Sequence, residues 1–235
     1  MIDIIDKNPE PLCECGKPRQ KVFVEWAGKD IHSKWCVECE KKEAALAIEN
    51  ELREEKEVIA RAIKREIEPI YYKASLCDFS DGIRKLVASR RLEQGVFIWG
   101  KTGTGKSHLA SAMVKEFLMA GHTAKMVRFK DMVLSIRAGY DENKTEVSVL
   151  APYIRCIFLS IEDIGTIKSG KVESDFCKDT LLTVIDSRIQ REKPTVITTN
   201  LSPEQVWKSF GERIGSRIST FLTFKLEGRD RRLDK

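Results

Sequence analysis

The sequence predicts a three-layer α/β domain with a parallel sheet, preceded by a cysteine-rich segment and one amphipathic helix. From residue 95 onward, short apolar runs alternate with helix-length stretches, as they do in chains that cross over between parallel strands. Residues 1–39 contain four of the seven cysteines and no helix-length apolar pattern, whereas residues 40–68 are rich in Glu, Lys, Arg, Ala and Ile. We therefore expect three parts: 1–39, 40–68 and 69–235.

The middle part is predicted to be a single helix that ends at Pro69. Five apolar residues recur along it at helical spacing: Ile48, Leu52, Ile59, Ile63 and Ile67. Its seven basic and nine acidic residues do not favour DNA binding. We interpret the apolar stripe as a packing surface for the last part of the chain or for a partner.

The remaining elements follow in order. A linker at 70–81 precedes a short helix at 83–94. Strands are predicted at 96–99, 124–129, 156–161, 195–199 and 221–226. Helices are predicted at 107–120, 130–138, 174–191 and 203–210, with Gly121 at a helix C-cap and an exposed loop at 139–145.

A glycine-rich loop joins the strand 96–99 to the helix that follows it. Its residues are Gly100, Lys101, Thr102, Gly103, Thr104, Gly105, Lys106 and Ser107. This is the G-x-x-x-x-G-K-[ST] pattern in the strand–loop–helix context that phosphate binding requires. Gly103 and Gly105 let the backbone N–H groups point at phosphate oxygens. Lys106 can reach the β- and γ-phosphates, and Ser107 can bind Mg²⁺. The loop predicts a nucleoside triphosphate site.

Acidic and amide side chains are expected beside this loop. The apolar stretch 156–161 is followed by Glu162 and Asp163, and the strand 195–199 is followed by Asn200. Carboxylates at a strand end can hold Mg²⁺ and polarise the attacking water. Asn200 could hold the water or the γ-phosphate, although Asn is also favoured as a turn or N-cap residue.

The chain from about residue 69 to 235 resembles the AAA+ ATPase module of the DnaC/DnaI helicase loaders and their IstB-type transposition relatives. The matching segments are 67–79, 100–107, 161–165, 182–188, 194–202, 211–218 and 228–232. The resemblance implies an AAA+ fold, ATP and Mg²⁺ as cofactors, and self-association through the ATPase domain. It implies a loader of the hexameric replicative helicase onto single-stranded DNA, in the cytoplasm of a bacterium or encoded by a bacteriophage. An IstB-like ATPase that assists a transposase is the alternative.

The resemblance also assigns roles to residues. Lys106 and Ser107 match the Walker A pair, Glu162 and Asp163 the Walker B pair, and Asn200 the sensor 1 position. Arg217 resembles the arginine finger that enters the neighbouring subunit's site, with Arg213 as a second candidate. Arg232 resembles the sensor 2 arginine, with Arg229 and Arg231 close by in the sequence.

One departure from the family concerns the Walker B pair. The family usually places Asp first, whereas Glu162 precedes Asp163 here. Asp163 is one methylene shorter than Glu, and a displacement of about 1 Å can cost about 100-fold in rate. We therefore expect slow ATP turnover.

Two cysteine pairs near the N-terminus suggest a zinc site. They are Cys13 with Cys15 and Cys36 with Cys39, and His32 could replace one of them. Four thiolates at such separations suit tetrahedral Zn²⁺, and Gly16 can supply the tight turn. Free buried thiols are the alternative. Cys77, Cys156 and Cys177 have apolar neighbours and are expected in the core. Some loaders of the family carry a similar zinc region that contacts the helicase.

Composition limits the other classes. The net charge of +5 permits nucleic-acid binding without requiring it, and no apolar run approaches the roughly 20 residues of a membrane span. The acidic start, Met-Ile-Asp-Ile-Ile-Asp, differs from a signal peptide, so we expect a cytoplasmic protein. A small-molecule kinase with the same loop and a zinc adaptor with a vestigial nucleotide site are the remaining alternatives.

Overall fold

The computed structural model describes residues 12–24, 29–88, 95–165 and 174–230. The chain divides into two compact units, Met1–Val58 and Ile59–Lys235. The units are described separately below.

The first unit contains a hairpin and most of a long helix. Strands β1 (Lys21–Val24) and β2 (Lys29–His32) pair antiparallel, with Lys21 opposite His32. Helix α1 (Val37–Glu66) begins three residues before the predicted start at residue 40 and ends two residues before residue 68. The hairpin was not predicted from the sequence. Several apolar residues of α1 are exposed: Leu46, Ile48, Leu52 and Val58.

The second unit is built on a parallel five-stranded sheet, as predicted. Its strands are β3 (Val96–Trp99), β4 (Ala124–Arg128), β5 (Phe158–Ile164), β6 (Thr195–Thr199) and β7 (Leu222–Lys225). Their spatial order is β4-β5-β6-β3-β7, so β3 lies between β6 and β7. β6 is buried along its whole length and β3 along its first three residues, which reflects burial on both faces, as is typical of parallel strands. Because all strands are parallel, their carboxyl ends meet at one edge of the sheet.

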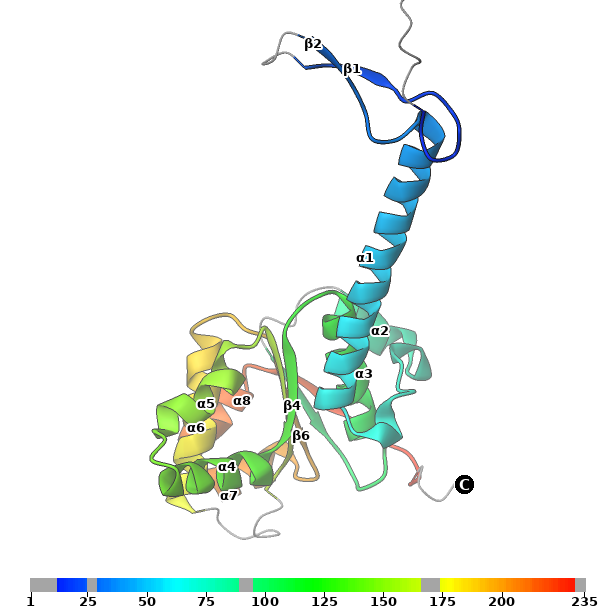
Figure 1. Ribbon diagram of the computed structural model, residues 1–235. Coiled ribbons are helices and arrows are strands. Elements are labelled where there is room, and N and C mark those ends of the chain that lie inside the picture. The colour runs from blue at the N-terminus through cyan, green and yellow to red at the C-terminus, as the bar shows by residue number, and fades with distance from the viewer. Residues whose placement is uncertain (1–11, 25–28, 89–94, 166–173, 231–235) are drawn as a thin grey trace, which may run out of the picture. The chain divides into compact units, whose positions relative to one another are not determined.

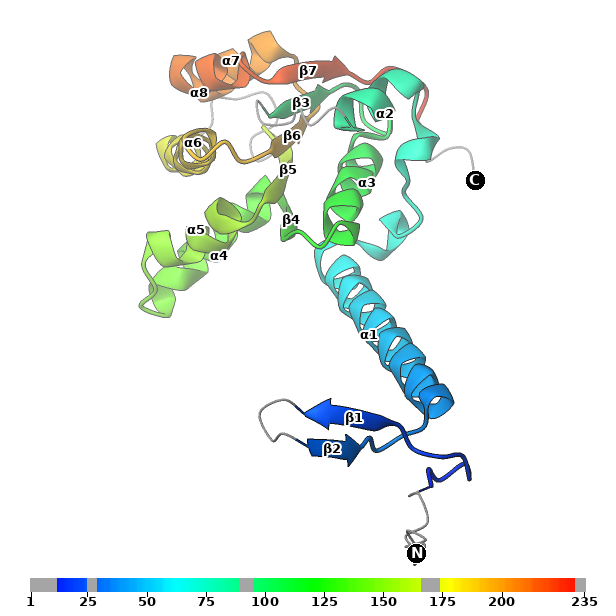
Figure 2. The same ribbon diagram turned by 90° about the horizontal axis from the view of Figure 1, so that it is seen from above.

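Helices cover both faces of this sheet (Figures 1 and 2). Helix α3 (Lys106–Met119) and helix α2 (Asp81–Ala88) lie on one side. The opposite side carries α4 (Phe129–Asp141), α5 (Glu146–Arg155), α6 (Asp175–Ile189), α7 (Pro203–Phe210) and α8 (Glu212–Ile218). One apolar cluster fills each interface. Phe97 belongs to the cluster under α4–α8, and its neighbour Ile98 belongs to the cluster under α3.

The last turns of α1 belong to the second unit. Ile67 is buried, and Ile63 packs against the same cluster as α3. This part of the predicted apolar stripe is therefore a packing surface for the second unit. Two short 3₁₀ helices follow, η2 (Pro69–Tyr71) and η3 (Leu76–Asp78).

Several predictions differ from the structure. Helices α5 and α8 were not predicted, and α4 continues to Asp141, into the expected loop 139–145. Of the three expected core thiols, Cys156 and Cys177 are buried, but Cys77 is exposed because η3 lies at the surface. Gly121 follows α3 with φ of +76°, which confirms the predicted C-cap. No helix in the described ranges has the length and apolar character needed to cross a bilayer.

Candidate nucleotide site and cysteine cluster

The glycine-rich loop lies between the carboxyl end of β3 and the first residue of α3. Gly103 and Gly105 have φ of +80° and +98°, a region that glycine enters without steric cost. The Thr104 hydroxyl donates to the Lys101 carbonyl at 2.9 Å and braces the turn. The predicted curl of the loop is confirmed.

Lys106 places its ammonium inside this loop. The residue is only 6% exposed, and Nζ donates to the carbonyl oxygens of Gly100 and Lys101 at 2.9 and 2.8 Å. Phosphate oxygens bound in the loop could accept hydrogen bonds from this ammonium.

Asp163 lies at an irregularity in β5. The pairing between β5 and β6 shifts between Ile161 and Ile164, and Asp163 has φ of +56°. Its backbone N–H donates to the Thr198 hydroxyl at 3.2 Å, which holds this unusual conformation. A bulge re-aims a side chain, and here Asp163 lines the same pocket as the glycine-rich loop.

Glu162, the preceding residue, is only 5% exposed. Burial raises the pKa of its carboxyl to about 7, and a hydrogen bond with Ser107 opposes the rise. Its Oε1 atom is among the buried polar atoms that have no hydrogen-bond partner in the described part of the chain. A buried, unpaired carboxylate oxygen beside a serine hydroxyl suits a divalent cation.

Lys106, Ser107 and Asp163 line a cavity of about 420 Å³ at the carboxyl edge of the sheet, whereas Glu162 lines a separate pocket and reaches the first one through its hydrogen bond with Ser107. Its lining residues are Ile70, Tyr71, Thr102, Gly103, Gly105, Lys106, Ser107, His108, Asp163 and Asn200. Asn200, the residue after β6, therefore lies beside Asp163 as the sequence suggested. The volume, the loop and the carboxylates fit a nucleotide with Mg²⁺.

Three lining residues were not singled out from the sequence: Ile70, Tyr71 and His108. The position of His108, directly after Ser107, was a signal that could have identified it. Ile70 and Tyr71 lie in a segment that matched the family, but nothing in its composition indicates that it reaches the cavity.

Arg213, Arg217 and Arg229 are not among the described residues that line this cavity. Arg217 lies in the last turn of α8, five residues before Leu222, which pairs with Val96 at the start of β3. It is therefore near the amino ends of the strands, at the edge opposite the glycine-rich loop. Arg213 is exposed on the same helix. Arg229 is exposed, whereas Arg231 and Arg232 lie outside the described residues.

The four N-terminal cysteines lie together in the first unit. The Sγ atoms of Cys13, Cys15, Cys36 and Cys39 are all within 4.8 Å of one another, and Cys15 and Cys36 are 3.4 Å apart. Tetrahedral zinc with Zn–S bonds of about 2.3 Å places sulfurs about 3.8 Å apart, so the set fits Zn²⁺. Gly16, with φ of +82°, donates its N–H to the Cys13 carbonyl in the expected turn. His32 lies in β2. The structure does not describe its side chain, so its role as a zinc ligand stays a prediction.

Hydrogen bonds and an ion pair surround the four cysteines. Hydrogen bonds from the backbone N–H groups of Cys15 and Cys36 lower the pKa of Cys13 to about 6. Lys17 and Glu38 form an ion pair across the turn, and Gln20 donates to Glu40 at 2.7 Å. The cluster is thus tied to the first turn of α1.

Comparison with known proteins gives consistent matches. The family profile of the IstB-like ATP binding protein matches residues 71–217, more than half of the chain. The replicative helicase loader DnaC of Escherichia coli K12 is 30% identical over 120 residues, which are 51% of this chain and 47% of that protein. DnaC of Buchnera aphidicola subsp. Acyrthosiphon pisum is 28% identical over 203 residues, covering 78% of this chain and 81% of that protein.

A solved structure shows the same fold. The crystal structure of the DnaC helicase loader aligns with a TM-score of 0.59 and 22% identity, covering 68% of this chain and 100% of that one. The second unit therefore has the AAA+ fold that the sequence predicted. The chain spans about half the length of the first curated relatives that it matches.

Proposed function

Because the chain belongs to the family of IstB-like ATP-binding proteins, we propose that it is an ATPase that loads the replicative DNA helicase onto single-stranded DNA. The observation that carries this proposal is the similarity to the Buchnera loader, which extends over most of both chains. The helicase hexamer, single-stranded DNA and further copies of this chain are the proposed partners, and the bacterial cytoplasm is the proposed location.

In this proposal the cavity at the strand ends holds ATP. The backbone N–H groups of the glycine-rich loop and Lys106 bind the phosphates. Ser107 and Glu162 hold Mg²⁺, which when bound neutralises charge on the phosphate oxygens. Asp163 accepts a proton from the attacking water, and Asn200 orients that water.

Assembly would complete the site. Arg217 lies at the opposite edge of the sheet, so it serves a neighbouring subunit, where its guanidinium neutralises charge on the transferring phosphoryl group. Arg232 would act as sensor 2 on the subunit's own nucleotide. Turnover in the isolated chain is therefore slow, and ATP acts mainly as an assembly signal.

The cysteine cluster would hold a structural zinc ion in the unit that contacts the helicase. A segment of this size has little apolar core, so metal binding contributes directly to its folding. The exposed apolar residues of α1 between Leu46 and Val58 would lie in the same contact.

Native mass spectrometry tests the proposal. The full chain is mixed with the hexameric replicative helicase of its host, with and without ATP. We expect a defined complex that is weakened by removing residues 1–58 and that transfers the helicase to single-stranded DNA when ATP is present. No complex under either condition would contradict the loader role.

A second candidate is an ATPase that assists a DNA transposase, which the name of the matching family favours. The two candidates differ in their partner and not in the nucleotide site. Binding to a transposase with ATP-dependent assembly on double-stranded DNA, without helicase binding, would decide for this second candidate.

A further inference from the structure

Besides the glycine-rich loop, two groups of residues line the cavity. Asp163 and Asn200 come from the ends of β5 and β6, where the proposed γ-phosphate chemistry takes place. Ile70, Tyr71 and His108 come from η2 and the first turn of α3. Ile70 and Tyr71 offer apolar and aromatic surface, which suits a sugar and base better than phosphates.

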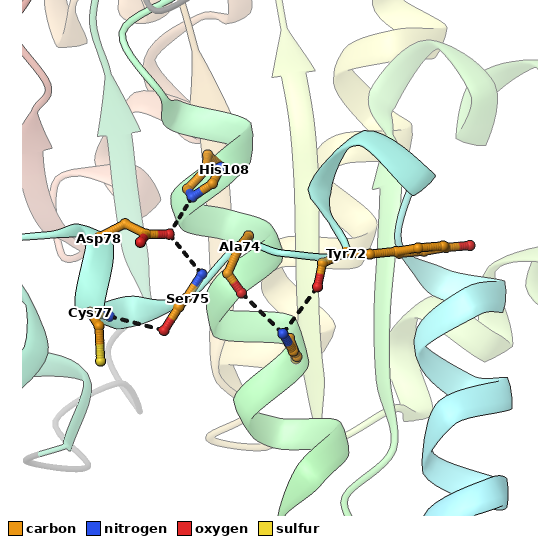
Figure 3. A network of polar contacts seen from close by, with 7 residues as sticks. Tyr72, Ala74, Ser75, Cys77, Asp78 and His108 are labelled. Atoms are coloured by element: carbon orange, nitrogen blue, oxygen red, sulfur yellow. Dashed lines mark hydrogen bonds and ion pairs between the residues drawn. The ribbon is translucent and has the colours of Figure 1, made fainter.

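His108 is held in place by a fixed carboxylate (Figure 3). Its Nε2 lies 2.6 Å from Oδ2 of Asp78, and the same Oδ2 accepts the backbone N–H of Ser75 at 2.9 Å. Ser75 in turn accepts the backbone N–H of Cys77 at 3.2 Å, which completes a capping box around η3. Because Asp78 is an acceptor, the imidazole carries a hydrogen on Nε2 and its Nδ1 edge points elsewhere.

Two aromatic rings limit the rotation of the imidazole. The Tyr71 ring is 6.3 Å away at 81°, and the Phe79 ring is 5.7 Å away at 51°. The His108 side chain nevertheless keeps 28% of its surface exposed. It therefore has an open edge and a fixed orientation, as a ligand-reading residue requires.

A second tie fixes the segment that carries these groups. Lys115, two turns further along α3, donates to the carbonyl oxygens of Tyr72 at 3.1 Å and Ala74 at 3.3 Å. Figure 3 shows both carbonyls beside this nitrogen, with His108 nearer the start of the same helix and Asp78 facing it from η3. Residues 70–79 are thus bound to the helix that starts with Lys106.

We propose that His108 binds the nucleoside half of the nucleotide and that Asp78 is its positioning residue. The Nδ1 edge accepts a hydrogen bond from a donor group of the sugar or base, and Ile70 and Tyr71 form the apolar wall beside it. This inference rests on the proposed nucleotide binding. It deepens that function by assigning a residue that recognises the sugar or base of the nucleotide.

The test compares three ligands on the full chain in the presence of Mg²⁺. Binding of ATP, ADP and inorganic tripolyphosphate is measured by calorimetry or by displacement of a fluorescent nucleotide. For His108→Ala we expect ATP and ADP to bind about 10-fold more weakly, by the same factor, since a lost ligand hydrogen bond costs about that much. Tripolyphosphate, which has no sugar or base, binds as before.

Further variants separate recognition from folding. Asp78→Ala should reproduce most of the His108→Ala loss, whereas Asp78→Asn retains an acceptor oxygen and should bind ATP within about 3-fold of the unaltered chain. His122→Ala is the matched control, because His122 is an exposed histidine just beyond the other end of α3. Thermal melting of each variant checks that it is folded. His108→Gln serves as a second substitution at the same position, in case His108→Ala fails to fold.

Each other outcome overturns the inference. Equal weakening of tripolyphosphate would place His108 on the phosphates, and weakening of ATP alone would place it on the γ-phosphate side. Unchanged binding of all three ligands by His108→Ala would show that His108 has no role in ligand binding. If the unaltered chain binds tripolyphosphate but no nucleotide, or binds none of the three, the proposed function itself fails as well.

Discussion

Arg217 donates a hydrogen bond from Nε to Oδ1 of Asp186 at 2.8 Å. The pair joins α8 to the end of α6, at the amino edge of the sheet, and 38% of the Arg217 side chain is exposed. A guanidinium held by Nε has its orientation fixed, while the two terminal nitrogens form the edge that matches a phosphate. Asp186 thus holds Arg217 at the edge of the sheet opposite the glycine-rich loop.

This arrangement predicts catalysis between subunits. Arg217→Ala should lower ATP hydrolysis at least about 100-fold with little change in ATP affinity, since arginine fingers contribute to the transition state. The Lys106→Ala variant should bind no ATP, but its intact Arg217 can still serve the site of a neighbouring subunit. A mixture of the two inactive variants should regain part of the activity, as measured by phosphate release. Arg213→Ala is the matched control, and full activity of Arg217→Ala would contradict the assignment.

The order of the Walker B pair predicts a gain of activity. Asp163 lies at the bulge of β5 with a backbone fixed by Thr198, so a longer side chain would extend toward the cavity from the same point. We expect Asp163→Glu to raise kcat about 10-fold, because it recovers roughly 1 Å of reach. Steady-state hydrolysis at saturating ATP measures this. A lower kcat would show that Asp163 is already at the right distance.

Glu162 predicts a pH-dependent effect on stability. Its folded-state pKa of about 7 lies above the ordinary value of 4.5, so folding favours the protonated form. The resulting destabilisation is absent below about pH 4.5, grows as the pH rises, and is complete above about pH 7. In EDTA at pH 8, Glu162→Gln should therefore be more stable by on the order of 2–3 kcal/mol.

Denaturant titrations at two pH values check this. At pH 8 the variant should unfold at a higher urea concentration than the unaltered chain, and near pH 4.5 the two should coincide. An equal difference at both values would mean that charge at Glu162 is not the cause.

The guanidinium of Arg188 predicts a large stability loss when it is removed. This buried side chain donates to six oxygen acceptors, at distances from 2.7 to 3.4 Å. They are the Thr195 hydroxyl and the carbonyls of Tyr153, Ile154, Cys156, Ile157 and Pro194. Arg188→Met would remove all six hydrogen bonds and should cost about 3–5 kcal/mol in unfolding free energy. Arg191→Ala, at an exposed neighbouring position, should cost less than about 0.5 kcal/mol.

Zinc analysis tests the cysteine cluster. The purified chain should contain about one zinc ion, and Cys39→Ser should lose most of it. Cys77→Ser should keep the metal, because Cys77 is an exposed thiol outside the cluster. Metal content by mass spectrometry decides the matter, and retention of zinc by a Cys13→Ser, Cys39→Ser double variant would contradict the site.

Most of the sheet could be predicted because its strands are short, rich in apolar and β-branched residues, and separated by helical patterns. The bounds of β3 and β6 agree with the prediction to the residue. Helix α5 was missed because Pro152 and the β-branched residues of 146–155 disfavour a helix locally. Tertiary contacts reverse that preference, since Leu150 is buried and Arg188 binds the carbonyls at the helix end.

Helix α8 was missed for a related reason. Gly211 and Gly215 suggest a loop, but the Trp207 ring lies so close that a Cβ on Gly215 would be 2.5 Å from it. Glycine therefore allows close helix packing here, which only the tertiary structure reveals. The same limit applies to the site, because the loop and carboxylates follow a linear pattern, whereas the contact of residues 70–79 with α3 does not.

Two glycines of the glycine-rich loop are required by contacts within the protein, apart from any contact with a ligand. A Cβ on Gly100 would lie 2.2 Å from the Leu226 carbonyl oxygen, and one on Gly103 would lie 1.9 Å from the Asp230 carboxylate. Selection for folding alone would therefore preserve both glycines in a descendant that had abandoned nucleotide binding. Across diverging lineages, persistence of these two glycines is therefore weak evidence, by itself, of retained ATP use.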